Sequence, residues 1–113
     1  MHELALAQSL IDLIEREALT HGFTRVREVR IALGQLSHVD AEALIFGFTA
    51  SARGTRAEGA HLSFLAVPGT AWCLGCDQSV PLAKRGDPCP RCGSYQLQVT
   101  GGDDLSVKDL EVV

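Results

Sequence analysis

The chain has 113 residues, of which 46% are hydrophobic and 21% charged, and its net charge is −4. These values are typical of one globular domain, or of one domain with a small appendage, and they exclude a disordered chain. The acidic balance argues against a nucleic-acid-binding protein, and no apolar run approaches the roughly 18 residues of a membrane helix. The beginning of the sequence has no secretory signal pattern, so we expect a cytoplasmic protein.

The first predicted elements are a helix and a strand. Apolar residues recur every three or four positions over residues 3–21, which predicts an amphipathic helix that Gly22 ends in a left-handed turn. The residues that this periodicity predicts to be buried are Leu4, Ala7, Leu10, Ile11, Leu13, Ile14 and Ala18. Apolar residues then alternate with others over residues 25–33, which predicts a strand.

A second helix and a second strand follow. The helix is expected to begin near Ser37 or Asp40, which are both good N-cap residues, and to end by Gly54. The residues predicted to be buried are Leu44, Ile45, Phe48 and Ala52. The second strand is predicted over residues 60–67.

Residues 69–97 differ from the rest of the chain in composition. Glycine, proline and cysteine dominate there, and three basic residues against two acidic ones give a net charge of +1. Alternation resumes over residues 95–100, and Gly101-Gly102 turns the chain into a last strand, which we expect to return to the first sheet. Its apolar parity slips near Lys108-Asp109, which predicts a β-bulge. The order of elements predicts an α+β fold, with two helices on a small three-stranded sheet and the cysteine-rich segment as an insertion.

Four cysteines, Cys73, Cys76, Cys89 and Cys92, form two Cys-x2-Cys pairs with twelve residues between them. Two residues between thiolates let both sulfurs of a pair reach one cation, and the spacer has room for a short hairpin that brings the pairs together. Four thiolates suit a structural zinc ion in a zinc-ribbon-like domain, with no open coordination position. Two alternatives stay open: disulfides or inert thiols, which the cytoplasm disfavours, and iron in place of zinc.

The beginning of the chain is a second candidate for a metal site. His2 places an imidazole and an amide next to the α-amine of Met1, and Glu3 adds a carboxylate. Nitrogen donors favour nickel and copper, although most N-terminal residues are frayed. Catalysis is not indicated, because His2-Glu3 lacks the second histidine of a zinc protease, and Ser37-His38-Val39-Asp40 fits a helix cap better than a catalytic triad.

Several motifs together resemble those of one known family. In chain order they are Met1-His2-Glu3-Leu4-Ala5, Leu33-Gly34-Gln35-Leu36-Ser37 with Asp40, Glu58-Gly59-Ala60, the two cysteine pairs and Leu105-Ser106-Val107-Lys108-Asp109-Leu110-Glu111-Val112. Over essentially the whole chain, they resemble the HypA/HybF nickel metallochaperones of [NiFe]-hydrogenase maturation. The resemblance implies a nickel-binding domain over residues 1–68, completed by a strand within residues 98–113, and an inserted zinc-binding domain over residues 69–97.

The resemblance also implies the metal ligands. Nickel is bound by His2 and Glu3, with the Met1 amine, the backbone amides of His2 and Glu3, and Asp40 as further candidates. Zinc is bound by the four cysteines. Two departures from the family pattern are His38, two residues before Asp40, and the lack of a histidine directly after either cysteine pair.

The function implied by the resemblance is transport, not catalysis. The protein binds Ni(II) at its N-terminus and delivers it to the [NiFe]-hydrogenase large subunit, together with the GTPase HypB. No nucleic-acid or membrane partner is expected, and the chain is a monomer or a weak or domain-swapped dimer. The cysteine pairs alone also fit a zinc-ribbon adaptor that binds nucleic acid or a protein complex. The sequence leaves open which nickel enzyme receives the metal, the nickel coordination number and the role of His38.

Overall fold

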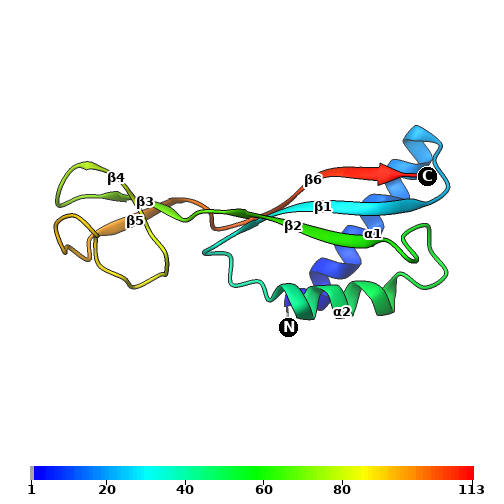
Figure 1. Cartoon of the computed structure of the whole chain (residues 1–113), viewed down its shortest axis with the longest axis horizontal. Helices are drawn as coiled ribbons and strands as arrows, with labels where there is room; N and C mark the ends of the chain where they lie inside the picture. The colour runs from blue at the N-terminus through cyan, green and yellow to red at the C-terminus, as the bar shows by residue number, and fades with distance from the viewer. Residues whose placement is uncertain (1) are drawn as a thin grey trace. The chain divides into compact units, whose positions relative to one another are not determined.

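The computed structural model describes residues His2–Val113, and for His2 the backbone alone. The elements run in the order α1 (His2–His21), β1 (Val26–Gly34), α2 (Ala41–Ser51), β2 (His61–Val67), β3 (Thr70–Cys73), β4 (Gln78–Pro81), β5 (Leu97–Gly101) and β6 (Leu105–Val112) (Figure 1). They form two three-stranded sheets, one ordered β2-β1-β6 and one ordered β4-β3-β5. The predicted α+β fold is confirmed, with two helices, a small sheet and an inserted segment that carries the cysteines. Among the described helices, none is long and apolar enough to span a bilayer.

The chain divides into two compact units. The helical unit contains the chain up to Ile31 together with Val39–Phe64 and Val107–Val113, and the cysteine unit contains Ala32–His38 and Leu65–Ser106. Strands β1, β2 and β6 each contribute residues to both units. The cysteine unit therefore includes a short segment from the end of β1 that lies far from the cysteines in the sequence.

The core of the helical unit forms between the two helices and the sheet. Its largest fully buried side chains are Phe48, Ile14, Ile31, Leu44 and Val29. The helical periodicity is confirmed at most positions, but the burial predicted for Leu4 and Ile45 is wrong, since they are 58% and 40% exposed. Both lie at the edges of their helices' packed faces, where the apolar stripe is wider than the surface that it packs against.

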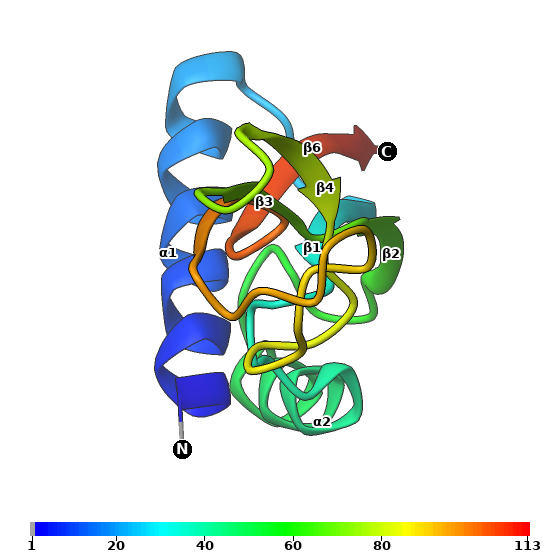
Figure 2. The same cartoon turned by 90° about the vertical axis from the view of Figure 1, so that its left-hand side faces the viewer.

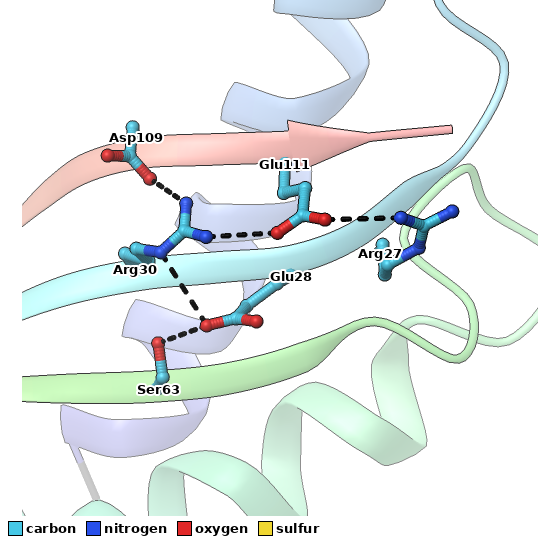
Figure 3. Close-up of polar contacts among 6 residues, drawn as sticks. All are labelled: Arg27, Glu28, Arg30, Ser63, Asp109 and Glu111. Carbon is cyan, nitrogen blue, oxygen red and sulfur yellow. Dashed lines mark hydrogen bonds and ion pairs between the residues drawn. The ribbon is translucent and has the colours of Figure 1, made fainter.

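Strand β6 returns to the first sheet beside β1, as the sequence predicts. On the face of the sheet opposite α1, Arg30 donates hydrogen bonds to Asp109 (2.6 Å) and Glu111 (2.9 Å), and Arg27 donates to Glu111 (3.1 Å) (Figure 3). These ion pairs join the last strand to the central strand of the sheet. The β-bulge expected near Lys108-Asp109 stays a prediction.

The cysteine unit is built on the hairpin of β3 and β4 (Figure 2), and β5 is the third strand of its sheet (Figure 1). Strand β3 pairs with β4 on one side, from Thr70 with Pro81 to Cys73 with Gln78, and with β5 on the other. The turn of the hairpin is therefore the first cysteine pair itself. This differs from the sequence prediction, which placed a hairpin within the spacer, because β3 reaches Cys73 and β4 begins two residues after Cys76.

Candidate metal centres

The four cysteine sulfurs lie at the spacing of a tetrahedral metal site. All four sulfurs lie within 4.8 Å of one another, and the shortest Sγ–Sγ distances are 3.6 Å for Cys73–Cys92 and 3.7 Å for Cys76–Cys89. Four thiolates about 2.3 Å from a central zinc ion would lie about 3.8 Å apart. All four cysteines are free thiols, so the disulfide alternative does not describe this structure.

Backbone N–H groups point at the sulfurs in both cysteine pairs. In the first pair, the N–H of Cys76 donates to Cys73 Sγ (3.4 Å). In the second, the N–H groups of Arg91 (3.4 Å) and Cys92 (3.5 Å) donate to Cys89 Sγ. Such bonds stabilise thiolates, and the N–H of Cys92 is the main cause that lowers the pKa of Cys89 to about 6. The second turn therefore favours the thiolate of Cys89, the form that binds a metal.

Burial has the opposite effect on part of the cluster. Desolvation raises the pKa of Cys76 to about 12 and so favours the neutral thiol of this residue. Four thiolates at this spacing would repel one another without a cation between them. The residues present therefore fit a bound metal ion, which would neutralise the charge that the protein itself does not.

A residue outside the cysteine-rich segment completes the core around the cluster. Leu36 is 2% exposed and belongs to the same buried cluster as Cys73 and Cys89 in the cysteine unit. Its N–H donates to the carbonyl of Gly102 (2.7 Å), and a Cβ on Gly69 would lie only 2.6 Å from its Cγ. The preceding residue, Gln35, accepts the N–H of Gly69 through its side-chain oxygen (3.0 Å).

Sequence reasoning assigned no role to Leu36. The available signal was a leucine directly after the Gly34-Gln35 break, where a polar turn residue would be ordinary. Its contacts show that the Leu36 side chain belongs to the metal-binding unit, although it lies 37 positions before Cys73 in the chain.

The structure brings Glu3 into contact with the backbone of Asp40, the other acidic residue expected near nickel. Glu3 lies in the first turn of α1 and is 8% exposed, and its Oε2 accepts the backbone N–H of Asp40 (3.0 Å). This hydrogen bond is the main cause that lowers the pKa of Glu3 to about 2. The Glu3 carboxylate is therefore ionised at neutral pH and is fixed between the beginnings of the two helices.

Asp40 is the N-cap of α2. Its Oδ1 accepts the N–H groups of Glu42 (3.0 Å) and Ala43 (3.2 Å), which confirms the capping role expected from the sequence. The backbone of Asp40 thus positions the Glu3 carboxylate, while its side chain begins the helix.

Met1, His2 and His38 are the other residues considered as nickel ligands. The structure gives the backbone of His2 as the first residue of α1, whereas the His2 side chain and Met1 lie outside the described part. His38 is exposed, belongs to the cysteine unit and has φ of 62°, a backbone conformation that is uncommon for a histidine.

Comparison with known proteins gives one consistent result. A family model described as "Hydrogenase/urease nickel incorporation, metallochaperone, hypA" matches residues 1–112. A "Hydrogenase maturation factor HypA" of Rhodopseudomonas palustris (strain BisB5) is 54% identical over 112 residues, which is 99% of each chain. That of Azotobacter vinelandii is 49% identical, also over 99% of each chain. These matches span both units, so the adaptor alternative, which rested on the cysteine pairs alone, loses its support.

Solved structures show the same fold at low identity. The solution structure of the Ni metallochaperone HypA from Helicobacter pylori aligns with a TM-score of 0.69 at 21% identity, over 98% of this chain and 97% of that one. A second solution structure of a HypA protein aligns with a TM-score of 0.73 at 23% identity, over 100% of this chain and 97% of that one. With the whole-chain sequence match, the chain belongs to the HypA family of nickel metallochaperones, which are maturation factors and not catalytic enzymes.

Proposed function

We propose that this chain binds one Ni(II) ion at its N-terminus and holds a structural zinc ion in the cysteine unit. The observation that carries the proposal is the buried, ionised Glu3 carboxylate, which the backbone of Asp40 holds in the first turn of α1. A fixed carboxylate directly after His2 adds an oxygen ligand, or a hydrogen-bond acceptor, to the nitrogen ligands of Met1 and His2.

The first turn of a helix is suited to such a site. The first four backbone N–H groups of an α-helix have no carbonyl partner within the helix. Nickel bound to the amide nitrogens of His2 and Glu3 would therefore break no hydrogen bond of the α1 backbone ladder. The site also lies at the end of the chain, whereas Cys73 and Cys89 are buried, so we infer that nickel exchanges and zinc is retained.

The proposed recipient is the [NiFe]-hydrogenase large subunit, and the proposed partner in delivery is the GTPase HypB, both in the cytoplasm. Whole-chain similarity to hydrogenase maturation factors supports this proposal. The family description names urease as well, so urease is the alternative recipient.

Nickel titration by calorimetry on the untagged, zinc-loaded chain tests the N-terminal site. We expect one nickel ion per wild-type chain and loss of that binding in His2→Ala, with zinc retained in both. A matched control keeps His2 and Glu3 but extends the chain before Met1 by two residues, which moves the free α-amine away from His2. We expect this form to bind nickel more weakly than wild type.

The same titration across pH gives a second test. The imidazole and the α-amine coordinate only when unprotonated, so nickel affinity should fall as the pH drops below about 8. Glu3 does not contribute to this fall, because its pKa is about 2. Equal nickel binding by wild type and His2→Ala, or an affinity independent of pH, would contradict the proposal.

A further inference from the structure

The outward side of α2 carries an unusual run of uncharged residues. No charged residue occurs from Ala43 to Ala52, and only Glu42 is charged within the helix. Ala43, Phe46 and Ala50 follow one another at steps of three and four, so they share one side of the helix, and all three are exposed. Phe46 is 77% exposed. A contiguous exposed apolar patch of this kind is typical of a surface that contacts another molecule.

Helix α1 extends this surface. Leu4 is 58% exposed, and its Cδ1 lies 3.7 Å from the position that a Cβ on Gly47 would occupy. Gly47 lies next to Phe46 in the chain and one turn from Ala43 and Ala50. We name the exposed set Leu4, Ala43, Phe46 and Ala50 the α2 apolar face.

The α2 apolar face borders the proposed nickel site. Leu4 directly follows Glu3, whose carboxylate accepts the N–H of Asp40 at the beginning of α2. Figure 1 shows the beginnings of the two helices beside each other. A protein that takes nickel from this end of the chain must approach within coordination distance of it, and therefore meets this face.

We propose that the α2 apolar face is the docking surface for the protein that receives nickel, which would present an uncharged apolar surface next to its own nickel ligands. This inference rests on the proposed function. The absence of charge between Glu42 and Arg53 favours an apolar partner surface over an acidic or basic one. A second copy of the chain seated symmetrically on this face would bring two nickel sites together and hide both from a recipient.

The test measures binding of the purified hydrogenase large-subunit precursor to Phe46→Ser by surface plasmon resonance. A central aromatic residue of an interface commonly contributes enough for its loss to weaken binding about tenfold or more. The matched control is Leu19→Ser, because Leu19 is 79% exposed near the other end of α1. We expect this control to bind the precursor as wild type does. Ala50→Arg is a second variant, which puts a charge on the face without removing the aromatic ring.

Nickel binding, precursor binding and the oligomeric state in solution together distinguish the outcomes. Nickel titration of Phe46→Ser should match that of wild type, since Phe46 is not a proposed ligand. If the wild-type protein binds no nickel, the proposed function is wrong. Binding of the precursor is then still measured with the nickel-free chain and tests the docking surface separately. Unchanged precursor binding by both Phe46→Ser and Ala50→Arg would overturn the proposal. It would also be overturned if wild-type protein were a dimer in solution and Phe46→Ser a monomer, because the face would then join two copies of this chain.

Discussion

The helical unit and the cysteine unit obtain their stability from different sources. In the helical unit, aromatic and aliphatic side chains such as Phe48, Ile14 and Leu44 fill a core between helices and sheet. In the cysteine unit, the buried cluster has six residues, two of which are cysteines, Cys73 and Cys89. The same short chain therefore combines two kinds of core. The core of the helical unit needs no metal, whereas the cysteine cluster of the other unit needs a metal ion to complete it.

Metal removal should have the largest effect and should separate the two units. Structural zinc contributes on the order of 10–16 kcal/mol to small zinc-binding peptides at neutral pH, so a chelator, or Cys73→Ser, should unfold the cysteine unit. Amide hydrogen exchange should show lost protection in β3, β4 and β5 and retained protection in the middle of α1. Restoring zinc to the chelated wild type should restore protection. Equal loss of protection in both units would show that the helical unit also depends on the metal.

A matched pair of leucine substitutions should come next in size. Leu36→Ala removes a buried side chain from the cysteine unit, and Leu44→Ala removes one from the helical unit. Each should lower the free energy of unfolding of its own unit by about 2–5 kcal/mol. Only Leu36→Ala should speed the release of zinc to a coloured chelator, because Leu36 belongs to the buried cluster that contains Cys73 and Cys89. Equal release rates for the two variants would mean that Leu36 does not support the metal site.

The cap of α2 should have a smaller effect. Asp40→Ala removes the acceptor for two backbone N–H groups and should lower the free energy of unfolding of the helical unit by about 1 kcal/mol. Asp40→Asn keeps a capping oxygen and should be close to wild type in thermal unfolding. If Asp40→Asn nevertheless weakens nickel binding in the titration, the carboxylate itself acts at the nickel site. Equal nickel binding would leave Asp40 as a capping residue alone.

The smallest effect should come from Glu15, which joins α1 to the chain after α2. Its carboxylate accepts the backbone N–H of Arg56 (3.0 Å) and pairs with the Arg56 guanidinium, and these contacts lower the pKa of Glu15. A carboxylate whose pKa is lower in the folded state stabilises the fold above its unfolded pKa, near 4.5. This contribution is lost as the pH falls through the lower folded value.

Urea unfolding followed by helical circular dichroism tests this expectation. Glu15→Gln should be less stable than wild type at pH 7, and the difference should shrink as the pH falls below about 4.5. The control is Asp12→Asn, an exposed carboxylate on the same helix, which should change stability little at either pH. A difference that is independent of pH would show that the charge of Glu15 is not what stabilises the contact.

The sequence by itself determined the features that depend on local chemistry. The terminating Gly22 (φ 78°) and the Asp40 cap are confirmed, and the helix periodicity is confirmed at most positions. The return of the last strand to the first sheet, which was expected from the order of the elements, is confirmed as well. The two Cys-x2-Cys pairs predicted one metal site, since the spacing within each pair fixes how its sulfurs can converge. Periodicity, capping and ligand spacing each act over a few residues and can be recognised without knowing the fold.

Tertiary structure alone decided the contacts between distant segments. Leu36 shares a buried cluster with Cys73, and the N–H of Asp40 donates to Glu3; the two residues of each pair are 37 positions apart in the chain. Helical periodicity placed Leu4 in the core, because it tells which side of a helix is apolar but not how far the opposing surface extends. Which parts of an apolar stripe are covered depends on the partner elements, and at Leu4 and Ile45 the stripe stays exposed.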